Sequence, residues 1–340
     1  MKVLMISGDP AVLDSNSAVG KRTEEYRQVF GELDVLVCQN NILNFFAGFI
    51  NGFQLLRKKK FDVITAQSPE HWFFAWVYSK IFKIPWQMQI HTDILNKYFW
   101  RESLKNKIRA ILAKFLILRA SCIRVVSEKI KNSLTAYGLR PKAVAVLPIF
   151  VDMEKIKNAQ IKIDLHDKYG KDKFIILMAS RLTREKNIGL AVEALSSLIR
   201  ANKRIQLIIV GNGPEEKKLK LRTMDYELWT NVAFEPWINN LASYYKTCDL
   251  FLLTSNYEGY GMTLLEAAAC GAKIVSSNVG IAPEILDPEN IFKVGDKNDL
   301  KSKLKLAIER KIKPAKPLRV QTKEDYLMLY KESLEQCLKK

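Results

Sequence analysis

The sequence predicts an α/β protein with two doubly wound domains, in which helices cover both faces of a parallel sheet. Short apolar runs of strand length alternate with segments of three-to-four periodicity along the whole chain. Six such runs fall in each half, and 340 residues are enough for two domains with separate cores. The alternation therefore indicates one parallel sheet in each half.

The expected strands follow one another in a regular order. In the first half they are residues 3–7, 34–38, 62–66, 86–91, 123–127 and 144–147. In the second half they are residues 174–180, 206–211, 232–236, 250–255, 273–277 and 291–294. Their apolar character predicts strands buried on both faces, as parallel sheets require.

The domain boundary is expected where periodicity weakens, between residues 148 and 164. We therefore expect a first Rossmann-like domain over residues 1–155 and a second over residues 156–320. Residues 321–340 predict a separate amphipathic helix. Its apolar face would contain Tyr326, Tyr330, Leu334 and Leu338.

The charge is strongly positive and uneven. The formal net charge is +18, and residues 57–142 contain 18 Lys or Arg against 5 Asp or Glu. This bias predicts an anionic partner, which could be a membrane surface, a nucleotide, a phosphate-bearing acceptor or nucleic acid. A lysine-rich composition with solvated helix faces is the alternative.

The five cysteines are scattered, without a Cys-x-x-Cys pair, and four lie in apolar segments. This usage is typical of a reducing cytoplasm and argues against a disulfide framework or a zinc site. No apolar run approaches the length of a membrane span, and the first residues resemble a strand more than a signal peptide. The sequence therefore predicts a cytoplasmic protein.

Residues 258–266 combine a glycine-rich turn with two carboxylates. They follow a buried strand, and Gly259 and Gly261 would allow a ligand to approach the backbone closely. Amides at the start of the next helix, around residues 261–264, would point at an anion such as a pyrophosphate. Glu258 and Glu266 would lie on either side of this turn. A strand, a turn and a helix with two solvated glutamates is the alternative.

This segment resembles the Glu-x7-Glu signature of retaining GT-B glycosyltransferases of the family 4 type. Residues 179–187 are similar to the family's Arg-Leu-x-x-x-Lys motif, which implies that Arg181 and Lys186 hold a diphosphate. The alternative for both is a surface charge at a helix start. The strand that runs into Gly211 and Gly213 also matches a family pattern near the nucleotide. A dinucleotide fingerprint is excluded, because Glu216 stands where its third glycine is required.

The resemblance implies a GT-B fold, with a cleft between the domains and a last helix that returns to the first domain. The implied catalytic residues are His91, Arg181, Lys186 and Glu258. The implied donor-binding residues are Gly20, Gly211, Gly213, Trp237, Gly259, Tyr260, Gly261, Met262, Thr263 and Glu266. No metal ligand is implied, since the chain contains no Asp-x-Asp.

Two loops depart from the family pattern. After the first strand, where the family often has a pair of glycines, this chain has Ser17, Ala18 and then Gly20. The same loop is no P-loop, because Arg22 stands where Ser or Thr is needed. The second departure is at Gly280, which is followed by Ile281 where a second glycine is common in the family.

Residues 101–119 predict a basic amphipathic helix. Leu104, Ile108, Leu112 and Phe115 lie along one side, with lysines and arginines off it. We expect the apolar side to pack on the sheet, while the cations face solvent or attract anionic lipids.

Together these features predict a retaining, metal-independent glycosyltransferase. It would move a sugar from a UDP- or GDP-sugar to a hydroxyl of a lipid-linked or other cell-envelope glycan, without a cofactor. Its partners would be that donor, the acceptor and an anionic membrane surface, with a peripheral place on the inner face of the cell membrane. A nucleotide-sugar epimerase or a phosphorylase of the same fold is the enzymatic alternative. A nucleic-acid-binding protein is disfavoured, because no recognition motif is present.

Overall fold

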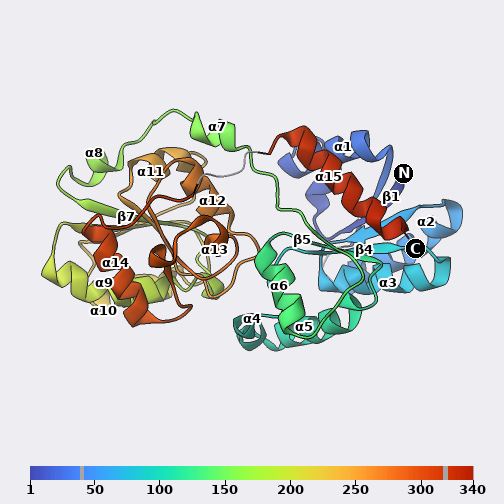
Figure 1. Ribbon diagram of the computed structural model, residues 1–340, viewed down its shortest axis with the longest axis horizontal. Helices are drawn as coiled ribbons and strands as arrows, with labels where there is room; N and C mark the ends of the chain where they lie inside the picture. The colour runs from blue at the N-terminus through green and yellow to red at the C-terminus, as the bar shows by residue number, and fades with distance from the viewer. Residues whose placement is uncertain (39–41, 317–320, 340) are drawn as a thin grey trace. The chain divides into compact units, whose positions relative to one another are not determined.

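The computed structural model describes residues 1–38, 42–316 and 321–339, and it contains two six-stranded parallel sheets (Figure 1). Each expected strand forms, with its ends moved by at most two residues. The predicted α/β fold class is therefore confirmed.

The first sheet has the strand order β2-β1-β3-β4-β5-β6. Its strands are β1 Lys2–Ser7, β2 Glu32–Val37, β3 Val63–Ala66, β4 Trp86–Ile90, β5 Cys122–Val125 and β6 Val144–Val146. The described helices of this unit are α1 Ala18–Phe30, α2 Ile42–Lys58, α3 Pro69–Phe82, α4 Lys97–Glu102, α5 Leu104–Ile117, α6 Glu128–Ala136 and α15 Lys323–Glu335, with 3-10 turns η1 Pro10–Leu13 and η4 Gln336–Leu338.

The second sheet has the order β12-β11-β10-β7-β8-β9. Its strands are β7 Phe174–Ala179, β8 Ile205–Val210, β9 Val232–Glu235, β10 Leu250–Leu253, β11 Ile274–Ser277 and β12 Ile291–Phe292. Its helices are α7 Met153–Lys157, α8 Leu165–Tyr169, α9 Ile188–Ala201, α10 Glu216–Asp225, α11 Leu241–Thr247, α12 Met262–Ala269, α13 Ala282–Ile285 and α14 Lys297–Ile308, with η2 Arg184–Lys186 and η3 Pro288–Asn290. The strand order reverses between β7 and β10, which makes the carboxyl ends of these two strands the expected place for a ligand.

The chain divides into two compact units. The first contains Met1–Phe150 and Gln321–Lys340, and the second Val151–Val320. Helix α15 thus belongs to the first unit, where Figure 1 draws it in red beside α1 in blue. Tyr326, Tyr330 and Leu334 are buried in a core shared with Tyr26, as the amphipathic pattern predicts. Leu338, expected on the same face, is exposed instead because the helix ends at residue 335.

One expectation about the cysteines is wrong. Cys122 at the start of β5 and Cys337 after α15 form a disulfide, with their Cα atoms 5.0 Å apart. The two residues are separated by 215 positions in sequence and meet only because α15 returns to the first sheet. Spacing along the chain could not have indicated this pair.

The predicted helix over residues 101–119 differs from the structure in two ways. Ser103 ends α4 and caps α5 through its side chain, so the segment is two helices. The buried residues of α5 belong to another side of the helix, and they are Asn106, Ala110, Ala113, Leu116 and Ile117. Leu104 and Ile108 are 73% and 59% exposed, so the expected packing of this apolar side on the sheet is wrong.

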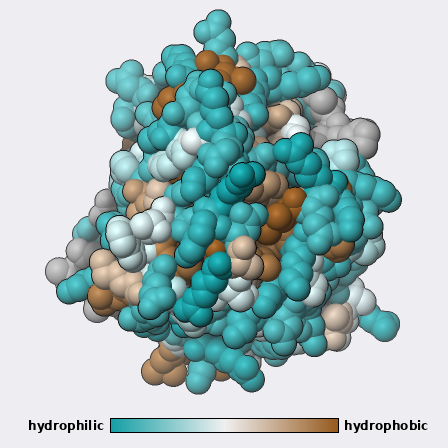
Figure 2. All heavy atoms as spheres, turned by 90° about the vertical axis from the view of Figure 1, so that its left-hand side faces the viewer, coloured by the Kyte–Doolittle hydropathy of each residue, from teal (hydrophilic) through white to brown (hydrophobic). Residues whose placement is uncertain are grey.

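One face of the second unit is largely polar. Figure 2 shows the face on the side of α8, α9 and α14, where hydrophobic residues occur in small groups among hydrophilic ones. Such scattered residues are normal for a protein surface. Within the described ranges, no helix combines the length and the apolar character that crossing a bilayer requires.

Candidate active site

The candidate site lies where β7 and β10 end in the second unit. These strands are neighbours and parallel, so the segments that follow them meet at one edge of the sheet. Thr254 ties the segments together, because its hydroxyl lies 2.9 Å from the carbonyl oxygen of Lys186 and 3.1 Å from that of Asn187. A threonine just beyond β10 thereby fixes the backbone of η2.

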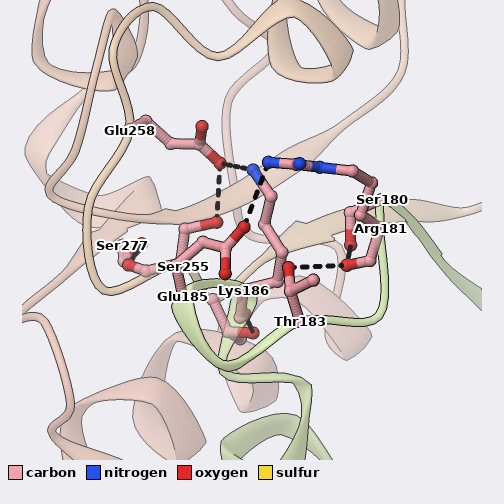
Figure 3. A network of polar contacts seen from close by, with 9 residues as sticks. Ser180, Arg181, Thr183, Glu185, Lys186, Ser255, Glu258 and Ser277 are labelled. Atoms are coloured by element: carbon pink, nitrogen blue, oxygen red, sulfur yellow. Dashed lines mark hydrogen bonds and ion pairs between the residues drawn. The ribbon is translucent and has the colours of Figure 1, made fainter. Parts of the chain in front are cut away.

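A polar network joins the two segments (Figure 3). The Nζ atom of Lys186 lies 2.6 Å from Oε1 of Glu258, and the two side chains are only 15% and 13% exposed. Ser255 donates a 2.7 Å hydrogen bond to the same Oε1, and Ser277 donates to the carbonyl oxygen of Ser255. The network therefore holds a largely buried cation and carboxylate in fixed positions at the sheet edge.

Arg181 lies at the same edge but is much more exposed than Lys186. Its side chain is 76% exposed, and its Nη2 atom lies 3.1 Å from Oε1 of Glu185 (Figure 3). The Glu185 side chain is only 12% exposed, so the ion pair is open to solvent only on the Arg181 side. A guanidinium at this edge can bind two oxygens of a phosphate at once.

Gly211 and Gly213 are required by packing. Gly211 has φ +145°, and a Cβ atom there would lie 1.9 Å from the carbonyl oxygen of Ser180. A Cβ atom on Gly213 would lie 2.4 Å from the carbonyl oxygen of Leu182. Both glycines thus let the loop after β8 lie against the loop that carries Arg181.

The turn before α12 depends on two further glycines. Gly261 has φ +96° and precedes the helix, which no side chain of the described residues caps. Met262 and Thr263 form the first helical turn and are partly exposed. A Cβ atom on Gly280 would lie 2.3 Å from the carbonyl oxygen of Tyr260, which already accepts a 2.8 Å bond from the amide of Ile281. Gly280 is therefore needed to hold the turn that contains Glu258 and Gly259.

Glu266 lies one turn into α12 and has a partner that sequence reasoning missed. The hydroxyl of Tyr245 lies 3.2 Å from Oε2 of Glu266. Burial raises the pKa of the Glu266 carboxyl, and the bond from Tyr245 only partly offsets this effect. Tyr245 lies in α11, 21 positions earlier, and no pattern in the sequence connects the two residues.

The remaining predicted donor-binding residues differ in their surroundings. Trp237 follows β9 and is 47% exposed, whereas Tyr260 is buried. In the first unit, the amide of Gly20 donates to the hydroxyl of Ser17 at the start of α1, and a Cβ atom on Gly20 would lie 1.9 Å from the carbonyl oxygen of Asp14. Packing and capping thus account for Gly20 in this structure.

His91 directly follows β4 in the first unit. Its Nε2 atom lies 3.2 Å from Oε1 of Gln89, and the residue as a whole is half-buried. Burial, together with the positive charges of Arg124 and Arg22, lowers the pKa of His91 to about 3. The imidazole is therefore neutral at physiological pH. Within the part of the chain that the structure describes, no group of three or more His, Cys, Asp and Glu could hold a metal ion.

Two protein-family models match most of the chain. The model for glycosyl transferases group 1 matches residues 162–324, and the model for glycosyltransferase family 4 matches residues 17–155. The first contains the β7–β10 site, and the second contains His91.

Curated relatives are similar at moderate identity. The chain is 27% identical over 255 residues to the UDP-Gal:alpha-D-GlcNAc-diphosphoundecaprenol alpha-1,3-galactosyltransferase of Escherichia coli. The matched region covers 72% of this chain and 65% of that protein. It is 24% identical over 244 residues to the alpha-monoglucosyldiacylglycerol synthase of Streptococcus pneumoniae, and this match covers 68% of this chain and 55% of that protein. The chain thus spans between about half and two thirds of these relatives' own length.

Solved structures share the fold over the whole chain. Sucrose-phosphate synthase from Thermosynechococcus elongatus has a TM-score of 0.74 at 18% identity, covering 99% of this chain and 94% of that one. Anabaena HepE in complex with UDP has a TM-score of 0.70 at 19% identity, with the same coverage. At these identities the likeness shows the GT-B fold. The two family models and this fold together establish that the chain belongs to the GT-B glycosyltransferases of the family 4 type.

Proposed function

We propose that this chain is a retaining glycosyltransferase that moves a sugar from a nucleoside-diphosphate sugar to an acceptor hydroxyl. The observation that carries the proposal is the Lys186–Glu258 pair at the carboxyl edge between β7 and β10. This arrangement places a cation for a phosphate beside a carboxylate that can accept hydrogen bonds from sugar hydroxyls. Both contacts to Glu258, from Lys186 and Ser255, use Oε1.

The leaving group would be stabilised by fixed positive charge and by amides. Bond cleavage at the anomeric carbon leaves negative charge on the diphosphate, and Lys186 and Arg181 would neutralise it. The amides of Met262 and Thr263, behind Gly261, would bind the same anion at the start of α12. The acceptor hydroxyl would attack on the face that the diphosphate leaves, so the anomeric configuration is kept and the diphosphate can take the proton.

The donor is proposed to be a UDP- or GDP-sugar, with Glu266 binding the ribose and main-chain atoms near Trp237 reading the base. Solved structures of Anabaena HepE contain UDP and UDP-glucose, which supports a uridine donor. No cofactor or metal ion is part of the proposal. Activity that persists in excess EDTA would support this, and activity restored only by a divalent cation would refute it.

The acceptor is proposed to be lipid-linked. The names of two relatives describe transfer to a diphosphoundecaprenol-linked sugar and synthesis of a glucosyldiacylglycerol. Neither relative is an epimerase or a phosphorylase, so the alternative has no support from them. Release of free nucleoside diphosphate only when an acceptor is present would separate transfer from both alternatives.

We also propose a peripheral place on the inner face of the membrane. The α5 stripe, defined as Leu104, Ile108, Ile111, Phe115 and Leu118, is exposed along one side of the helix. Exposed cations lie near it at Lys105, Lys107 and Arg119. An apolar stripe flanked by cations suits a surface of anionic lipids.

Vesicle co-sedimentation tests this surface. Wild-type protein should bind phosphatidylglycerol vesicles more than phosphatidylcholine vesicles, and Ile108→Ser with Ile111→Ser should weaken that binding. Leu221→Ser on α10 is the matched control, because Leu221 is also an exposed aliphatic residue but belongs to the second unit. Equal binding by the α5 variant and the control would refute the proposal.

The donor site is tested first by thermal shift. UDP-, GDP- and ADP-sugars are screened against the wild type and Glu266→Ala, since a ligand that binds the folded state raises the melting temperature. One nucleotide series should stabilise the wild type, and less so the variant. No shift with any of these donors would refute the donor site. The product's anomeric coupling in NMR then tests retention.

A further inference from the structure

A closed polar network lies under His91 in the first unit. Gln89 in β4 is fully buried, and its side-chain amide contacts residues of β3, β5 and α15. The contacts are Thr65 Oγ1 at 2.6 Å and Tyr330 Oη at 2.7 Å from Nε2, and Arg124 Nη1 at 3.2 Å from Oε1. These partners determine which way the amide faces.

Arg124 sets the orientation of Gln89. A guanidinium can only donate hydrogen bonds and stays charged in proteins, so the Gln89 atom beside it must be the carbonyl oxygen. Arg124 is itself 2% exposed and is held by the Tyr326 hydroxyl at 2.9 Å and by the carbonyl oxygens of Leu147 and Pro148. It also lies over the Tyr330 ring, 4.3 Å from the ring centroid.

A second chain of bonds fixes the same orientation independently. Gln87 donates from Nε2 to the carbonyl oxygen of Ser333 in α15, so its Oε1 is free to accept from Thr65. Thr65 then has its hydroxyl proton engaged and accepts from Gln89 Nε2. Two networks that begin at different residues thus place Oε1 of Gln89 toward His91.

The orientation of Gln89 decides the tautomer of His91. An amide oxygen cannot donate, so Nε2 of His91, 3.2 Å away, must carry the proton of this bond. In a neutral imidazole the other nitrogen, Nδ1, is then an acceptor. The charges that face the ring are both positive, from Arg124 in β5 and Arg22 in α1, and they disfavour a second proton.

We propose that Gln89, held by Arg124 and by Tyr330 of the C-terminal helix, fixes His91 as the neutral Nε2–H tautomer and so presents Nδ1 to a hydroxyl of the donor sugar. This inference rests on the proposed function and on the sequence-based expectation that His91 is one of its catalytic residues. Gln89, Arg124 and Tyr330 act through His91 and are positioning residues. Helix α15 would thereby contribute to the chemistry through Tyr330, although this residue is itself buried away from solvent.

Long-range ¹H–¹⁵N correlation NMR of the full chain, without substrate, tests the tautomer. The chain has three histidines, and loss of one signal in His91→Asn assigns the residue. His91 should show a protonated Nε2 and an unprotonated Nδ1, unchanged between about pH 5 and pH 8. A proton on Nδ1, or titration near the ordinary value of about 6.5, would overturn the proposal.

Substitutions separate positioning from stability. Gln89→Leu removes the acceptor and should give mixed tautomers and about tenfold lower kcat. Tyr330→Phe keeps the ring over Arg124 and should give a smaller change in the same direction, which keeps the test available if Gln89→Leu fails to fold. Tyr26→Phe is the matched control, because its hydroxyl contacts Tyr326 and not Gln89.

The outcomes distinguish this inference from the proposed function. A fixed Nε2–H tautomer in a protein that transfers no sugar would refute the function and leave the tautomer established. Transfer activity with unchanged tautomer and kcat in both Gln89→Leu and Tyr330→Phe would refute the positioning role. Equal losses in Tyr330→Phe and Tyr26→Phe would also refute it, since they would indicate a packing effect alone.

Discussion

Replacing Lys186 with methionine is expected to lower both stability and turnover, for different reasons. Removing one partner of a fully buried ion pair costs roughly 3–5 kcal/mol, because the other charge stays buried without compensation. The side chains of Lys186 and Glu258 are 15% and 13% exposed, so water reaches both groups. We therefore expect Lys186→Met to reduce the free energy of unfolding by about 1–3 kcal/mol.

The double variant Lys186→Met with Glu258→Gln separates the two effects. It removes both charges, and the amide oxygen of Gln can still accept from Ser255, so most of the lost stability should return. Turnover should stay about ten- to a thousandfold below wild type in both variants, because the leaving diphosphate has lost a cation.

Urea denaturation measures the stabilities, and the initial rate of nucleoside diphosphate release measures turnover. A double variant as unstable as the single variant would show that the lost stability does not come from an uncompensated carboxylate. Wild-type turnover in Lys186→Met would refute the role of this lysine at the leaving group.

Three further predictions follow from the same site and from the disulfide. Arg181→Ala should lower turnover by about ten- to a thousandfold with a stability change within about 0.5 kcal/mol, whereas Arg184→Ala, the exposed control, should change neither. Burial raises the pKa of the Glu266 carboxyl in the folded state, so the folded state loses stability as the pH rises above the pKa of the unfolded chain, about 4.3. Glu266→Gln should therefore raise the melting temperature at neutral pH but not in acid. The same variant should weaken donor binding. Cys337→Ser, measured against the wild type by urea denaturation, should cost about 2–4 kcal/mol, because it opens the long loop that Cys122 closes, and an unchanged midpoint would argue against the bond.

The fold was predictable because parallel strands have a strong local signal. Apolar runs such as residues 206–211 are buried on both faces of the sheet, so their composition alone indicates a strand. The order of the strands was not predictable in the same way. The reversal between β7 and β10, which determines where a ligand would bind, depends on pairings between segments about 70 residues apart in sequence.

Local motifs indicated the candidate site but not its supporting contacts. Glu258 and Lys186 stood out through their spacing to glycines and strand ends, and the structure brings them together. Tyr245 was identified only by geometry, because it acts through a hydroxyl from another helix. Gly280 was noticed in the sequence only as part of a departure from the family pattern, and its close approach to Tyr260 required the structure. Periodicity also failed on α5, where it found an apolar side correctly but could not tell whether that side faces the sheet or the solvent.

The Lys186–Glu258 network and the Arg124–Gln89 network show that polar residues buried to different degrees can have different roles. Lys186 and Glu258 are partly exposed, so a ligand can replace the ion pair between them. Arg124 and Gln89 are buried beneath α15, so every hydrogen-bond donor and acceptor there must find a partner within the protein. Only one orientation of the Gln89 amide meets this requirement. A partly exposed network can bind a ligand, whereas a fully buried network can only position neighbouring side chains. We therefore expect substitutions in the first network to change donor affinity and turnover as well as stability, and substitutions in the second network to act through the tautomer of His91.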